Sequence, residues 1–139
     1  MRTALAACTI VTLLTGCQAA EEAARSEAFD AIAADDIVRF TGTEPFWNGS
    51  IEGGTATYAT PENPDGTRFP VERFSGLNGA GYSGTLDGAT FDLTITPGTC
   101  SDGMSDRSYP YTATLLVGDE MREGCAWTDR QPFSEPATP

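Results

Sequence analysis

Three observations predict an all-β domain, a small antiparallel barrel or sandwich of about eight strands. Apolar and polar residues alternate in short runs between Ile37 and Trp127. Turn-forming residues separate these runs at intervals of about 8 to 14 residues. No helical period interrupts the pattern, so the domain is expected to consist of strands and turns alone.

The clearest predicted strands place apolar side chains at every second position. Successive side chains of a strand point to opposite faces, so this alternation predicts one buried face and one solvated face. Most of these residues are β-branched or aromatic, which strands prefer. They are Val38 and Phe40; Phe69 and Val71; Phe91, Leu93 and Ile95; and Tyr111, Ala113, Leu115 and Val117.

Glycine-containing turns separate the predicted strands. Asp87-Gly88 favours a type I′ hairpin turn, because both central residues of that turn need positive φ. Gly53-Gly54, the stretch 61–66 and Gly118-Asp119 indicate further turns. The glycine-rich stretch 76–84 lacks the lysine and the following helix of a phosphate loop, so it predicts a bulged hairpin.

The start of the chain resembles the leader of an exported bacterial lipoprotein. Arg2 precedes a mostly apolar run over 3–14, which is typical of a secretory signal and shorter than the roughly 20 residues of a membrane span. The following residues complete Leu14-Thr15-Gly16-Cys17, which resembles the lipobox, whose cysteine is lipidated after cleavage. We therefore expect a signal peptide over 1–16 and a lipid anchor on Cys17.

The predicted organisation has two further segments around a β domain at 36–130. Residues 17–35 are rich in alanine and glutamate, so a lipidated, partly helical tether is expected there, with Phe29 and Ile32 outside the core. The proline-containing tail 131–139 is predicted to be disordered. Gln18 replaces the aspartate that favours the inner membrane in enteric lipoproteins, so we expect an outer-membrane location facing the periplasm.

The composition limits the possible chemistry. The sequence has no histidine and no lysine, so Ser-His-Asp and Cys-His pairs are excluded, and most zinc sites with them. An acid pair such as Glu44 with Asp102 is the remaining route to catalysis, as in glycosidases, but nothing in the sequence places the two together. We therefore expect no enzyme activity, no cofactor and no metal centre.

The chain is strongly acidic. Its 20 acidic residues and 8 arginines give a formal charge of −12, and loss of Arg2 with the leader makes it −13. This charge disfavours nucleic acid and suits a basic protein or a divalent cation. It also keeps an envelope protein soluble, which leaves a passive structural role open.

Two cysteines remain once the leader is removed, Cys100 and Cys125. In the oxidising compartment of an exported protein they are expected to form a disulfide. The chain-entropy model assigns such a loop of about 25 residues roughly 3.5 kcal/mol of stabilisation. The alternative is a reactive thiol at Cys100, for which the sequence offers no neighbouring base.

Three motifs in the β domain are typical of one protein family. They are Gly42-x-Glu44-Pro-x-Trp47, then Cys100-x-Asp-Gly-Met-Ser105 with a following Tyr109-Pro-Tyr111, then Gly124-Cys125. In these motifs, residues 37 to 127 resemble an uncharacterised family of Gram-negative lipoproteins and membrane-associated proteins. That family in turn resembles META-domain lipoproteins and membrane-bound inhibitors of C-type lysozyme. The resemblance implies a small envelope β fold and no particular activity.

The first and second motifs supply candidate binding residues, each with an alternative. Glu44 and Trp47 suit a ligand platform, but Pro45 would also bend an edge strand and Trp47 would fill a barrel, which we favour. Asp102, Ser105 and Asp106 offer oxygen ligands for calcium, without EF-hand spacing. The favoured alternative is that Asp102 and Ser105 form local turns or cap a short helix over 103–108.

These features together predict a periplasmic binding or interaction module. Inhibition of a basic cell-wall hydrolase is the most specific version, because charge complementarity speeds encounter. Binding of a small ligand or a divalent cation, and a passive structural role, are the alternatives. The candidate contact residues are Glu44, Trp47, Asp102, Ser105, Asp106, Tyr109 and Tyr111.

Overall fold

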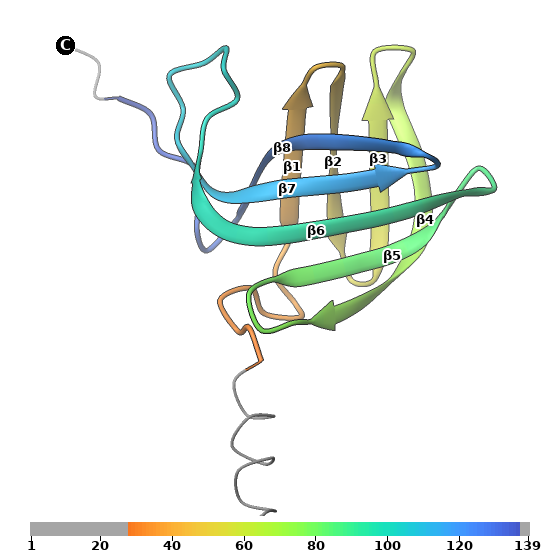
Figure 1. Cartoon of the computed structure of the whole chain (residues 1–139), viewed down its shortest axis with the longest axis horizontal. Helices are drawn as coiled ribbons and strands as arrows, with labels where there is room; N and C mark the ends of the chain where they lie inside the picture. The colour runs from red at the N-terminus through yellow and green to blue at the C-terminus, as the bar shows by residue number, and fades with distance from the viewer. Residues whose placement is uncertain (1–27, 137–139) are drawn as a thin grey trace, which may run out of the picture.

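The structure, a computed structural model, describes residues 28–136 and forms a closed antiparallel barrel of eight strands (Figure 1). Each strand pairs with the next along the chain, and β8 pairs with β1 to close the barrel. The predicted all-β class is confirmed, and the architecture is a barrel and not a sandwich. The strands are β1 (Val38–Thr43), β2 (Phe46–Glu52), β3 (Thr55–Thr60), β4 (Asn63–Ser75), β5 (Ala80–Leu86), β6 (Ala89–Cys100), β7 (Tyr109–Val117) and β8 (Glu120–Thr128).

The turns lie where the sequence predicted them, with two corrections. The stretch 76–84 forms a hairpin without the predicted bulge, because Val71 to Ser75 pair with Ala80 to Gly84 in a single register. Asp87 and Gly88 have φ values of 48° and 82°, which confirms the positive φ that a type I′ turn requires. The predicted turn over 61–66 is shorter, because β4 already begins at Asn63. Gly66 lies within β4 with φ of 78°, beside a register shift between Tyr58 and Thr60 in the pairing of β3 with β4.

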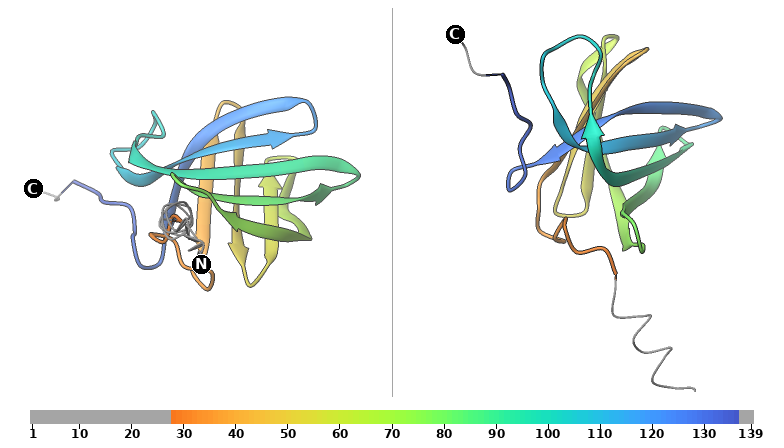
Figure 2. Two further views of the ribbon diagram at one scale, coloured as in Figure 1. Left: turned by 60° about the horizontal axis from the view of Figure 1, so that its bottom comes forward. Right: turned by 60° about the vertical axis from the view of Figure 1, so that its left-hand side comes forward.

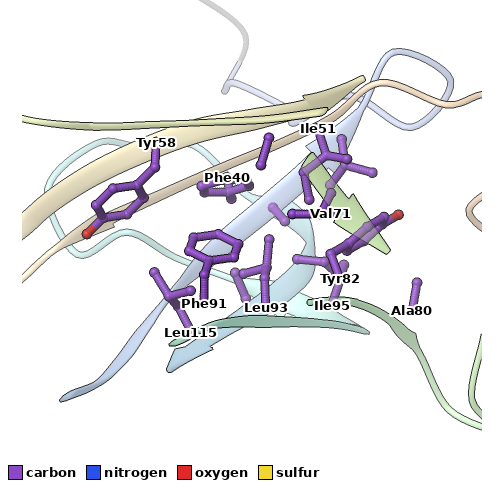
Figure 3. Packing of buried hydrophobic residues seen from close by; sticks show 14 of the residues in the cluster. Phe40, Ile51, Tyr58, Val71, Ala80, Tyr82, Phe91, Leu93, Ile95 and Leu115 are labelled. Atoms are coloured by element: carbon purple, nitrogen blue, oxygen red, sulfur yellow. The ribbon is translucent and has the colours of Figure 1, made fainter. Parts of the chain in front are cut away.

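The inward-facing residues fill the barrel (Figure 3). β6, β7 and β8 cross over β1, β2 and β3 in both views of Figure 2, so the inner faces of the two groups pack together. A chain of aromatic contacts runs through this interior, joining Phe40, Trp47, Tyr58, Phe91 and Phe69 with neighbouring ring centroids 4.9 to 6.4 Å apart. A barrel of eight strands has room inside for its own side chains, and here they occupy it.

The segment before β1 is part of the folded domain, which corrects the predicted tether. Ile32 is 0% exposed and belongs to the core cluster, and Phe29 packs against that cluster. Arg73 on β4 donates a hydrogen bond of 2.6 Å to the carbonyl oxygen of Ile32. Residues 28–35 contain no helix, whereas 17–27, where the rest of the tether and Cys17 fall, lie outside the described residues together with the predicted signal peptide.

The described residues contain no helix that is long and apolar enough to cross a membrane.

The start of the predicted disordered tail is also ordered, as far as Pro136. Ser134 forms a β-bridge with Ser108, and the Phe133 ring packs against Tyr109 and Trp127 with centroids 5.5 Å away in both cases. Prolines interrupt regular strands but do not prevent a segment from packing through an aromatic side chain. The prediction of disorder therefore fails for 131–136, and residues 137–139 lie outside the described residues.

The predicted disulfide is confirmed. Cys100 at the end of β6 bonds to Cys125 on β8, with the two Cα atoms 5.6 Å apart and 25 residues of separation. The bond therefore fixes the start of the β6–β7 loop to the outer face of β8.

Candidate functional site

Three segments distant in the sequence meet at one place on the barrel: the β1–β2 turn, the β6–β7 loop and residues 121–125 of β8. The turn and the loop lie at the upper edge in Figure 1. The Thr43 hydroxyl donates a 3.1 Å hydrogen bond to the carbonyl oxygen of Asp102, which joins the turn to the loop. The Cys100–Cys125 disulfide joins the same loop to β8. These two contacts bring the Glu44 turn beside the Asp102 loop, a proximity that the sequence alone did not predict.

A shallow groove lies between these segments, and we call it the acidic groove. Its first part is lined by Thr41, Thr43, Ser101, Asp102, Thr112 and Glu123, with the disulfide half-cystine Cys100 and the glycines 42 and 124. A second part shares Thr43 and Glu123 and extends to Glu44, Met121 and Arg122. The acidic groove therefore combines three carboxylates, several hydroxyls and one exposed methionine.

The carboxylates of the acidic groove differ in whether other groups of the protein pair with them. Glu44 and Glu123 form no ion pair within residues 28–136. Arg122, the base beside them, already donates to Glu120 and to the Tyr58 hydroxyl, and its side chain is only 17% exposed. The negative charges of Glu44 and Glu123 therefore remain available to a group from outside.

Asp102 instead organises its own loop. Its Oδ1 accepts hydrogen bonds from the backbone amides of Met104 and Ser105, and its Oδ2 accepts from the hydroxyls of Ser105 and Tyr109. The amide and hydroxyl of Ser105, together with the Met104 amide, hold the pKa of Asp102 well below its ordinary value. The predicted local turn is confirmed, but the loop contains no helix for Asp102 to cap.

The same hydrogen bonds bear on the calcium alternative. Four donors from the protein occupy the two oxygens of Asp102, and a cation would have to displace them. Within the part of the chain that the structure describes, no three acidic, histidine or cysteine side chains are grouped so as to hold a metal ion. Asp106 and Ser105 are exposed, but they line a separate hollow with Arg107 and Glu135.

Trp47 lies inside the barrel and is 1% exposed, so it fills the interior and does not offer a stacking surface. A β-carbon on Gly42 would lie 2.0 Å from its Nε1 atom, and one on Gly124 would lie 2.9 Å from its Cζ2 atom. The indole therefore occupies the space that side chains at both glycines would need. In this chain the packing brings Gly42 and Gly124 together around Trp47.

Pro45 also has a different position from the expected one. It lies in the turn between β1 and β2, after a cis Glu44–Pro45 peptide bond. Because β1 pairs with both β2 and β8, it is not an edge strand that Pro45 could bend. Glu44 itself is exposed at the tip of this turn.

The two tyrosines among the candidate residues are buried and serve packing. Tyr111 is 2% exposed, points into the barrel and lies with its hydroxyl 3.5 Å from the carbonyl oxygen of Ala31. Tyr109 is 3% exposed, packs against Trp127 and Phe133 and donates to Asp102. Of the predicted contact residues, Glu44, Ser105 and Asp106 are exposed, and Asp102 is half-buried.

Sequence reasoning missed four residues around this site. Glu123 and Met121 line the acidic groove. Phe46, the first residue of β2, and Met104, in the β6–β7 loop, are 52% and 69% exposed. Alternation along β8 indicates that the side chain of Glu123 faces outward. Gly124 packs inward against Trp47, and neighbouring residues of a strand face opposite sides. No sequence signal places β8 next to the Glu44 turn, since that depends on barrel closure.

Comparison with known proteins identifies no relative for this chain. No protein-family model, curated protein or solved structure matches it significantly.

Proposed function

We propose that this protein is an envelope lipoprotein whose barrel acts as a binding module, with the acidic groove as the docking site for a basic protein. The observation that carries the proposal is the pair of unpaired carboxylates, Glu44 and Glu123, brought to one groove from the β1–β2 turn and β8. Unpaired acids on one face attract a basic partner and raise the rate of encounter.

Exposed apolar side chains beside the acidic groove support the same proposal. Phe46, Met104 and Met121 are each more than half exposed, at 52%, 69% and 65%. Large apolar side chains and methionine are enriched in the cores of protein interfaces, where they supply contact area that charge alone does not. A groove with carboxylates inside and apolar residues around it suits a protein surface better than a small ion.

The filled interior supports an external site. Within the described residues, the side chains of the core cluster pack against one another inside the barrel, which favours the outer surface as the place for a site. The resemblance of the motifs to the envelope lipoprotein family is consistent with a partner in the periplasm. The most specific version is inhibition of a basic cell-wall hydrolase such as a C-type lysozyme.

The test is a titration of the full lipidated protein, in detergent micelles, with a C-type lysozyme. We expect saturable binding and slower cell-wall lysis at about 10 mM salt, and weaker binding at about 150 mM, where the screening length falls from about 30 Å to about 8 Å. Glu44→Gln with Glu123→Gln is expected to weaken binding by about tenfold at low salt, because two exposed charge pairs are lost.

The control is Glu52→Gln with Glu72→Gln, which removes the same charge from exposed positions outside the groove. Equal weakening by both pairs would show that only net charge matters and would contradict the groove as the docking site. If lysozyme does not bind at either salt concentration, the hydrolase version fails. Cross-linking of the intact lipoprotein in cells, followed by mass spectrometry, then tests the wider proposal. Any partner that is captured saturably by the parental protein should no longer be captured by the variant with Glu44→Gln and Glu123→Gln.

A further inference from the structure

A second exposed apolar surface lies at the other end of the barrel from the acidic groove. It consists of Phe74, at the end of β4, and Leu77, in the β4–β5 turn, which are 56% and 71% exposed. Leu77 exceeds every other large apolar side chain of the described residues in exposure. In Figure 1 this turn lies at the lower edge of the barrel, and the β6–β7 loop lies at the upper edge.

Phe74 and Leu77 project from well-defined backbone, Phe74 from β4 and Leu77 from the β4–β5 turn. A β-carbon on Gly81 would lie 2.0 Å from the Cζ atom of Phe74, so the Phe74 ring lies directly across Gly81 on the neighbouring strand. The amide of Gly76 donates a 2.8 Å hydrogen bond to the carbonyl oxygen of Gly79, which closes the turn that carries Leu77. The ring of Phe74 therefore covers backbone on the outer surface and cannot take an inward position in the core.

The chain enters the domain at this same turn. The amide of Phe29 donates a 2.8 Å hydrogen bond to the carbonyl oxygen of Gly76, the residue before Leu77. Residues 28–37 and the β4–β5 turn lie side by side in Figure 1 and in the views of Figure 2. The expected lipid attachment point, Cys17, is 11 residues before residue 28. A chain of that length spans at most about 40 Å when fully extended.

We propose that Phe74 and Leu77 form a membrane-contact surface that inserts into the bilayer to which Cys17 is anchored. The inference rests on the lipid anchor in the proposed function and adds an orientation to it. A short tether keeps this end of the barrel close to the bilayer, so even weak insertion is favoured by the high local concentration. The transfer of an exposed apolar side chain from water into the acyl region of a bilayer lowers the free energy.

The charges at this end indicate which lipid fits. Asp30, Asp35 and Glu72 are exposed near the turn, so a zwitterionic surface suits it better than an anionic one. Contact at the lower edge would leave the acidic groove facing away from the bilayer, toward the periplasm. The orientation therefore explains how a lipid-anchored barrel keeps its docking site accessible.

The test compares Leu77→Trp with Met104→Trp, since Leu77 and Met104 have nearly equal exposure, 71% and 69%. Leu77 belongs to the β4–β5 turn at the lower edge in Figure 1, and Met104 to the β6–β7 loop at the upper edge. Each full-length lipidated variant is reconstituted into phosphatidylcholine vesicles with brominated acyl chains, which quench tryptophan emission on contact. The parental protein gives the background from Trp47 and Trp127. We expect the added emission of Leu77→Trp to be blue-shifted and quenched at least twofold more than that of Met104→Trp.

Three results would overturn the inference. Equal and weak quenching of the two variants would show that the lower edge does not enter the bilayer. Emission from Leu77→Trp that shifts to the blue only as protein concentration rises, without quenching, would assign the surface to a second copy of the chain. If mass spectrometry finds no lipid on Cys17, the protein has no anchor at that residue and the inference fails. Binding at the acidic groove, measured with Glu44→Gln and Glu123→Gln in micelles, does not depend on any of these results.

Discussion

Asp36 at the lower end of the barrel and the pair Glu44 and Glu123 at the upper end differ in whether the protein itself pairs their charge. At the lower end, Arg130 donates from Nε and Nη2 to both carboxylate oxygens of Asp36, whose side chain is 7% exposed. Ile32 closes the same end of the core, and its carbonyl oxygen accepts from Arg73. At the upper end, Glu44 and Glu123 have no such partners within the described residues. The lower end therefore contributes to stability, and the upper end leaves charge for a partner.

The largest expected effect concerns the core beneath the acidic groove. Trp47→Ala removes a fully buried indole from between Gly42 and Gly124, and should lower the free energy of unfolding by about 3 to 5 kcal/mol. Phe46→Ala, at the neighbouring exposed position, should change it by no more than about 0.5 kcal/mol. Denaturant unfolding measures both values, and equal losses would contradict the assignment of Trp47 to the core.

A second prediction tests whether the segment before β1 belongs to the domain. Ile32→Ala should cost about 2 to 5 kcal/mol, because it opens a cavity at the closed end of the barrel. Leu77→Ala at the same end should cost no more than about 0.5 kcal/mol, since Leu77 is exposed. If Ile32→Ala were as stable as Leu77→Ala in denaturant unfolding, the lower end would not be closed by this segment.

The smallest expected effect concerns the ion pair at the lower end. Hydrogen bonding to Arg130 is the main cause of the lowered pKa of Asp36. Asp36→Asn should lower the free energy of unfolding by about 1 to 3 kcal/mol at pH 7, because Arg130 and the Ala33 amide lose a charged acceptor.

The pH dependence of this effect has a defined sign. A carboxyl with a lowered pKa in the folded state stabilises the protein above the unfolded pKa of about 4, and this contribution is lost as pH falls through the folded pKa. The difference in stability between the parent protein and Asp36→Asn should therefore be full at pH 7 and shrink below about pH 4. Denaturant titrations at several pH values measure it, and a difference that is constant down to about pH 2 would show that the Asp36 charge is not responsible.

The sequence predicted the strands well and the ends of the domain poorly. Alternation at positions such as Phe91, Leu93 and Ile95 identifies a buried face within a few residues, so it needs no knowledge of the partner strands. Ile32 has no such pattern around it, and its burial depends on the space left at the end of the closed barrel. Phe133 is similar, because its contact with Tyr109 and Trp127 depends on the path of the tail.

The candidate site was predicted in part. Glu44 and the Asp102 loop were identified from unusual local sequences, but their proximity depends on the Thr43 to Asp102 contact between residues 59 positions apart. Tyr111 was proposed for contact, and Trp47 for contact or, as the favoured alternative, for filling the barrel, because aromatic residues serve both binding and packing. Only their burial distinguishes the two roles, and burial is a property of the closed barrel.

The pairing of β1 with β8 also restricts how another chain can join this one. Residues Val38 to Thr41 pair with β2 on one side and with β8 on the other, so this seam of the barrel has no unpaired border of backbone amides and carbonyls. Such a border is what recruits an extended peptide as an added strand, and it is also what starts edge-to-edge polymerisation. Recognition at the seam between β1 and β8 must therefore proceed through side chains and loops, and crowding at a membrane surface should not join two copies along this seam.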